Sequence, residues 1–128
     1  MQPEKFSVKS RFGSFKFALR GLKSMLKNEH NSRIHLLAAV IALTLAVILK
    51  INRDEWALLI IVIGVVFITE LLNSSLEALA DLVDNEWNEK IKISKDYAAA
   101  AVIISAIIAL VIGGLIFIPK ILSLFSKH

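Results

Sequence analysis

The sequence predicts an all-α membrane protein with three transmembrane helices and an N-terminal amphipathic surface helix, in one domain over residues 1–128. Hydrophobic residues make up 56% of the chain, and the mean hydropathy is +0.68. They gather in three runs that are nearly free of charge, Ile34–Leu49, Trp56–Ile68 and Tyr97–Ile118. A soluble domain of this size could not bury three such runs, because small domains bury a low fraction of their surface. This excludes most soluble enzymes, secreted modules and disordered tails.

The surface helix is expected over about residues 5–29. The first 33 residues lack the continuous apolar segment of a signal peptide. Basic residues alternate there with hydrophobic ones, and part of the pattern has helical spacing: Phe15, Leu19, Leu22 and Leu26. Such a helix lies in the membrane interface with its basic side chains toward anionic lipid head groups. A basic tail with incidental hydrophobic residues is the alternative.

The three spans are expected at about residues 31–50, 56–83 and 97–118. The uncharged part of the first has 16 residues, fewer than the ~20 that a bilayer requires, so we expect tilt or a helical extension. Trp56 opens the second span as an interface aromatic. A short polar connection over residues 50–55 joins the first two spans, and a polar loop is expected over Asp84–Asp96. Pro119 is expected to end the third span.

The basic residues predict the orientation. Of the 15 Lys and Arg residues, eleven lie before the first span or in the second loop, and four lie on the opposite side. The positive-inside rule therefore places the N-terminus and the second loop in the cytoplasm. The net charge of +4 suits a bilayer with anionic lipids, and no nucleic-acid partner is expected. The chain has no cysteine, which excludes disulfides, thiol nucleophiles and cysteine-based zinc sites.

A polar stripe crosses the second half of the second span. Its members point within about 60° of one direction on a helix: Glu70, Asn73, Ser74, Glu77 and Asp81. Carboxylates at membrane depth are costly unless they are paired, hydrated or bound to metal. The stripe therefore predicts a shared function for these side chains.

The topology brings further charged residues to the same cytoplasmic depth, namely Glu29, Lys95 and Asp96. Carboxylate and amide oxygens suit Mg²⁺, which commonly keeps a phosphate among its ligands. Residue chemistry leaves three hypotheses open: a metal–phosphate site, a proton or ion pathway, and polar packing between spans. The histidines give weaker signals, and His35 fits a hydrogen-bonded or interfacial group better than a base.

The run Glu70-Leu-Leu-Asn-Ser-Ser-Leu-Glu-Ala-Leu-Ala-Asp81, followed by Lys95-Asp96, resembles the prokaryotic diacylglycerol kinase family. The segments Asn28–Arg33 and Phe15–Gly21 are also similar, so the resemblance covers about Phe12 to Lys120. It implies a small homotrimeric kinase of the bacterial cell (inner) membrane, with its active site on the cytoplasmic side. Such a kinase transfers the γ-phosphate of MgATP to the hydroxyl of a membrane lipid.

The resemblance also implies roles for particular residues. Glu70 is the general base, Glu29 and Glu77 bind Mg²⁺ with ATP, and Asn73 supports the lipid end of the site. The implied nucleotide contacts are Phe17, Glu29, Glu77, Glu86, Trp87, Asn88, Lys95 and Asp96. Phe17 stands where some members have Tyr, so a hydroxyl is lost there, and Ser75 stands where Ala is common.

The lipid acceptor is expected to be undecaprenol ahead of diacylglycerol. The run Arg33-Ile-His-Leu36 resembles the undecaprenol kinase branch, whereas the enterobacterial diacylglycerol branch carries an acid near His35. Two functions of other classes remain as alternatives. A small proton- or ion-coupled transporter requires a polar path across the bilayer, and residues 56–68 are apolar. A non-catalytic membrane scaffold subunit would not depend on the carboxylate of Glu70.

Overall fold

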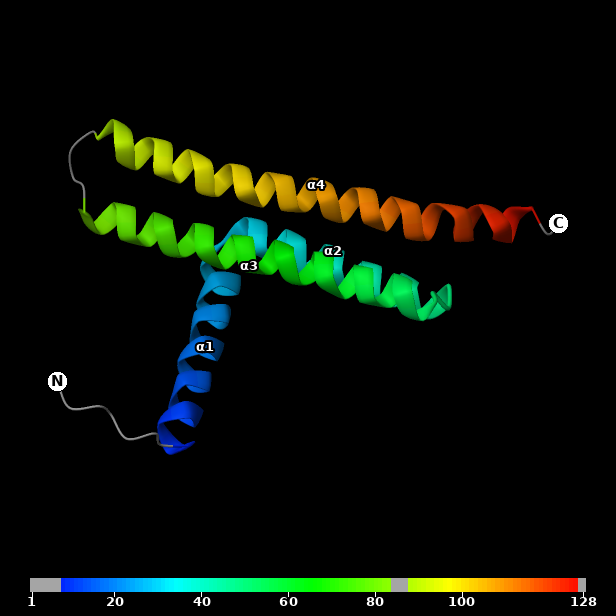
Figure 1. Cartoon of the computed structure of the whole chain (residues 1–128), viewed down its shortest axis with the longest axis horizontal. Coiled ribbons are helices and arrows are strands. Elements are labelled where there is room, and N and C mark those ends of the chain that lie inside the picture. Colours follow the sequence, from blue (N-terminus) through cyan, green and yellow to red (C-terminus); the bar gives the residue numbers. More distant parts are fainter. Residues whose placement is uncertain (1–7, 84–87, 127–128) are drawn as a thin grey trace.

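The structure of the chain, a computed structural model, describes residues 8–83 and 88–126. It contains four helices and, in these residues, no strand: α1 (Val8–Asn28), α2 (His30–Ile48), α3 (Arg53–Val83) and α4 (Glu89–Phe125). The last three are long and apolar enough to cross a membrane, which confirms the predicted fold class. In Figure 1, α3 and α4 lie side by side, α2 packs next to α3, and α1 projects steeply away from the other helices.

Helix α4 extends beyond the predicted third span, residues 97–118, at both ends. The expected polar loop over Asp84–Asp96 is helical from Glu89 onward, because the side chain of Asn88 accepts a hydrogen bond from the backbone N–H of Lys90 (3.0 Å) and caps the helix. At the other end, α4 continues through Pro119 to Phe125. Proline removes one backbone N–H, but membrane helices tolerate it where neighbouring groups satisfy the freed carbonyl.

The connection between α2 and α3 is tight and well capped. Lys50 has a φ of 49°, and the backbone N–H groups of Lys50 and Ile51 donate to the carbonyls of Val47 and Ala46 (both 3.2 Å). This is a Schellman motif, which ends α2 in the left-handed conformation. Asn52 and Glu55 then form a reciprocal capping box at 3.0 and 2.7 Å. As a result α3 begins at Arg53, within the predicted polar connection, and runs back along α2.

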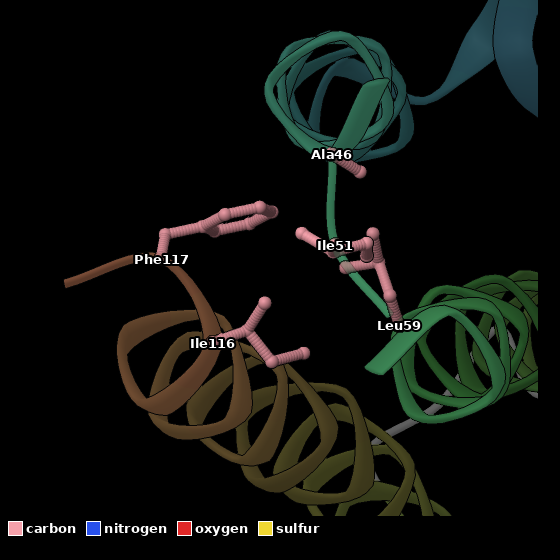
Figure 2. Packing of buried hydrophobic residues seen from close by; sticks show 5 residues of the cluster. All are labelled: Ala46, Ile51, Leu59, Ile116 and Phe117. Atoms are coloured by element: carbon pink, nitrogen blue, oxygen red, sulfur yellow. The ribbon is translucent and has the colours of Figure 1, made fainter. Parts of the chain in front are cut away.

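The small hydrophobic core sits at this end of the bundle. Figure 2 shows its members pointing toward one another from α2, the connection, α3 and α4: Ala46, Ile51, Leu59, Ile116 and Phe117. An ion pair joins the same end, since Lys120 Nζ lies 3.0 Å from Glu55 Oε2. These contacts fix the register of α3 against α2 and α4, to both of which it is antiparallel. That register determines which residues of α2 lie against the second half of α3.

Most large apolar side chains of α2, α3 and α4 are exposed in the single chain. In water such a surface would be unfavourable, whereas lipid tails or further copies of the chain can cover it in a membrane. The buried residues in the described part of the chain are therefore few, and three of them are polar: Ser32, Glu70 and Ser105. Polar groups buried in so small an interior need a specific reason, and they direct attention to the middle of α3.

Candidate active site

Glu70 is the most notable buried group of the chain, with 3% of its surface exposed. Both of its carboxylate oxygens face α2. Ser32 Oγ donates to Oε2 (3.4 Å), and His35 Nε2 lies 3.1 Å from Oε1. The second contact has the distance of an ion pair without the alignment of a hydrogen bond, so no described donor is hydrogen-bonded to Oε1. Ser32 and His35 are three residues apart, which places them on one face of α2.

The entry to α2 is held in place by a contact across the corner from α1. Arg33 Nη2 donates to the carbonyl of Lys27 at 2.8 Å. Between the two helices lies Glu29, in extended conformation (φ −99°, ψ 120°), half-buried and without a side-chain capping bond. Its carboxylate is therefore not used to cap the helix that follows. This leaves the predicted metal ligand at the junction of α1 and α2.

The next turn of α3 carries further polar atoms. Asn73 Nδ2 donates to Glu77 Oε1 at 3.3 Å. Asn73 Oδ1 and Ser74 Oγ are buried, and no hydrogen-bond partner reaches either of them from the described part of the chain. Buried polar atoms without partners are rare in folded proteins. Water or a small bound group is the expected partner of such atoms.

The start of α4 meets the end of this stripe. Lys95 Nζ lies 3.1 Å from Asp81 Oδ1, and both side chains have substantial exposure. An exposed pair of this kind contributes only about 0–1 kcal/mol to stability. Its value here is positional, because it places the cation of α4 beside the acids of α3. Asp96, which follows Lys95 in α4, is exposed.

The structure brings only part of the predicted site together. Glu70, Asn73 and Glu77 lie along one stripe of α3, and Lys95 reaches the end of that stripe. Phe17 lies apart from them: it is 65% exposed, and the guanidinium of Arg20 on the same helix lies 5.4 Å from the centre of its ring. Within residues 8–83 and 88–126, no three carboxylate or imidazole side chains form a metal-binding cluster. The predicted nucleotide contacts Glu86 and Trp87 lie outside the described residues.

The polar stripe of α3 offers oxygen atoms as metal ligands. The buried Oδ1 of Asn73, which has no described hydrogen-bond partner, lies next to Glu77. This chemistry fits a hard divalent cation such as Mg²⁺, which takes one or two carboxylates and completes its shell with phosphate and water. Glu77 offers one such carboxylate, next to the amide of Asn73. Softer metals that prefer thiolate or imidazole fit this stripe poorly.

Sequence reasoning missed Ser32 as a site residue and left His35 without an assigned role. The signal was present but weak, since a serine and a histidine three residues apart share one face at the start of an apolar span. His35 also lines an apolar cavity of about 600 Å³ between α2, α3 and α4, where it is the polar member of the lining. Ala38, Phe67, Ala109 and Gly113 are among the other lining residues. His35 therefore borders both the cavity and Glu70.

Comparison with known proteins gives consistent matches. The family model for prokaryotic diacylglycerol kinase matches residues 16–117. A diacylglycerol kinase of Synechocystis sp. is 38% identical over 112 residues, which cover 87% of this chain and 64% of that protein. An undecaprenol kinase of Bacillus subtilis is 36% identical over 110 residues, covering 86% of this chain and 89% of its own length. A diacylglycerol kinase of Escherichia coli K12 is 33% identical over 95 residues, covering 74% and 78%.

Proposed function

The chain belongs to the prokaryotic diacylglycerol kinase family, and on that premise we propose that it transfers the γ-phosphate of MgATP to the hydroxyl of a membrane lipid. The observation that carries the proposal for the site is the burial of the Glu70 carboxylate between apolar helices, with two side chains of α2 directed at its oxygens. A buried carboxylate is unfavourable for stability alone, and ionisable groups held at such a cost in membrane helices gather at functional sites.

In the proposed mechanism, the oxygen of the lipid hydroxyl attacks the γ-phosphorus of ATP, and the carboxylate of Glu70 accepts the proton that this hydroxyl loses. The bond from that phosphorus to the bridging oxygen of ADP breaks, and ADP leaves. Glu70 Oε1 suits this role because no described donor is hydrogen-bonded to it, so the oxygen can accept one from the alcohol. Positioning and electrostatics then supply most of the catalysis, as is general for phosphoryl transfer.

Glu29 and Glu77 would hold Mg²⁺, which when bound supplies positive charge to the phosphate oxygens. Asn73 holds Glu77 through its amide and supports the lipid end of the site. Lys95 adds a cation at the cytoplasmic end, where its partner Asp81 keeps it beside the stripe. The remaining proposed nucleotide contacts are Phe17, Glu86, Trp87, Asn88 and Asp96.

Undecaprenol is the proposed acceptor, with diacylglycerol as the second candidate. The resemblance of Arg33-Ile-His-Leu36 to the undecaprenol kinase branch supports this choice. The relatives carry both names, which makes diacylglycerol the second acceptor to test. The apolar cavity between α2, α3 and α4, which His35 lines, suits the hydrocarbon chains of either lipid.

We further propose a homotrimer with the N-terminus and the active site on the cytoplasmic side. The exposed apolar faces of the three long helices support association in the membrane. The excess of basic residues in the N-terminal segment and the second loop supports the orientation.

The direct test incubates purified protein in lipid with γ-labelled ATP and Mg²⁺, with undecaprenol or diacylglycerol as acceptor in separate reactions. We expect labelled lipid phosphate, with undecaprenol giving the higher kcat/KM. A higher value for diacylglycerol would correct the acceptor and leave the kinase intact. Absence of lipid phosphate from both alcohols would contradict the proposed function.

A further inference from the structure

We propose that His35 is a positioning residue that fixes the carboxylate of Glu70 for catalysis, with Ser32 as its partner on α2. This inference rests on the proposed function, since it concerns the same carboxylate. It adds two residues that neither the family resemblance nor the polar stripe of α3 assigns to the reaction.

The geometry supports a division of labour between the two oxygens of Glu70. Ser32 Oγ donates to Oε2 at 3.4 Å, which ties that oxygen to α2. His35 Nε2 lies 3.1 Å from Oε1 without forming an aligned hydrogen bond. The imidazole thus limits where Oε1 can move and leaves one of its lone pairs for an incoming hydroxyl.

The surroundings strengthen the assignment. Glu70 is almost completely buried, whereas His35 is half-buried and lines the apolar cavity between α2, α3 and α4. Ser32 is fully buried. A carboxylate with so little access to water takes its position from the few polar groups that touch it, because leaving it unpaired is costly. Among the described residues, these groups all come from the first two turns of α2.

The expected effect follows from the sensitivity of catalysis to geometry. A displacement of about 1 Å of a reacting group costs on the order of 10²-fold in rate. His35→Ala should therefore lower kcat by roughly 10- to 100-fold. The KM for MgATP should stay within about twofold, because the nucleotide is proposed to bind at other residues and an unchanged KM indicates unchanged ground-state binding. Ser32→Ala removes a long hydrogen bond and should cost only about three- to tenfold in kcat.

The conservative variant His35→Gln separates positioning from proton transfer. Its amide nitrogen can replace Nε2 beside Glu70, but it cannot accept a proton. We expect His35→Gln to recover most of the kcat lost in His35→Ala. Thr44→Val is the matched control on α2, because the Thr44 hydroxyl is exposed and donates only to the carbonyl of Val40 on its own helix (2.7 Å). It should keep the parent kcat.

The experiment measures kcat and KM for these variants in lipid, together with thermal unfolding of His35→Ala, Glu70→Gln and the double variant. Non-additive Tm changes are expected because the two side chains touch. Full kcat in His35→Ala, or a His35→Gln variant as impaired as His35→Ala, would overturn the proposal. Inactivity of the parent protein would contradict the kinase function instead, and additive Tm changes would then still overturn the His35–Glu70 coupling.

Discussion

The hydroxyl of Thr69 on α3 lies 2.8 Å from the hydroxyl of Ser105 on α4. Thr69 is the residue directly before Glu70 in the chain. Each hydroxyl also lies within hydrogen-bond distance of a carbonyl of its own helix, at 2.9 Å for Thr69 and 2.8 Å for Ser105. The two hydroxyls have two protons for these three contacts, so two of the contacts are hydrogen bonds at any one time. Such a pair links two long helices in the membrane interior, where direct apolar attraction between helices is weak.

Removing this link should weaken the bundle modestly. Thr69→Val keeps the shape of the side chain and deletes the hydroxyl, and hydrogen bonds between membrane helices are worth about 0.6 kcal/mol on average. We expect a decrease of about that size in the free energy of unfolding, measured by denaturant titration in detergent. Thr44→Val, which loses a hydroxyl bonded only within its own helix, is the control. Equal effects of the two substitutions would show that the Thr69–Ser105 contact adds nothing.

The turn between α2 and α3 offers a stabilising substitution. Lys50 adopts a left-handed conformation, which costs a non-glycine residue roughly 1 kcal/mol. Lys50→Gly should relieve that cost and raise the Tm, less a small loss because glycine gains freedom in the unfolded chain. Lys50→Ala is the matched control, since it also removes the charge but keeps the Cβ. A Tm for Lys50→Gly no higher than that of Lys50→Ala would contradict this reading of the turn.

Glu77 should affect nucleotide binding more than chemistry. Glu77→Gln keeps a hydrogen-bonding oxygen but removes the charge proposed to hold Mg²⁺. We expect the KM for MgATP to rise by about tenfold or more, equivalent to about 1.4 kcal/mol. Titration of Mg²⁺ at fixed ATP measures this directly. Asp54→Asn, an exposed acid at the opposite end of α3, is the control. An unchanged Mg²⁺ dependence in Glu77→Gln would remove Glu77 from the metal site.

Chelation provides an independent test of the metal. Removal of divalent cations with EDTA should abolish lipid phosphorylation, and added Mg²⁺ should restore it. The helical content measured by circular dichroism should stay the same, because the four helices are held by packing, caps and ion pairs among protein groups. Activity that persists in EDTA would rule out Mg²⁺ as a required component.

The helices could be predicted from the sequence better than their ends. Long uncharged runs identify the membrane-embedded part of a helix, and three such runs predicted three spanning helices. Hydropathy does not detect the charged turns that extend a membrane helix, so residues 89–96 were expected to belong to a polar loop. The cap at Asn88 shows why they do not. Pro119 was expected to end a helix that instead continues to Phe125.

The candidate site was predictable on α3 and not on α2. The polar residues from Glu70 to Asp81 share one face by helical spacing alone, which sequence reasoning can establish. The partners of Glu70 depend on which face of α2 packs against α3, and the α2–α3 turn together with the core around Leu59 sets that face. These are tertiary contacts, and the spacing of Ser32 and His35 is only a weak local signal for them, so Ser32 was missed and His35 had no assigned role.

The most direct measurement of the central claim compares the parent protein with Glu70→Gln in a single-turnover reaction with γ-labelled ATP and undecaprenol. Loss of a general base typically costs 10²- to 10⁴-fold in rate, so we expect a decrease of about that size. The variant should still bind MgATP and assemble as the parent does, as measured by KM and by size-exclusion chromatography in detergent. Phosphate transfer by Glu70→Gln at the parent rate would contradict the account.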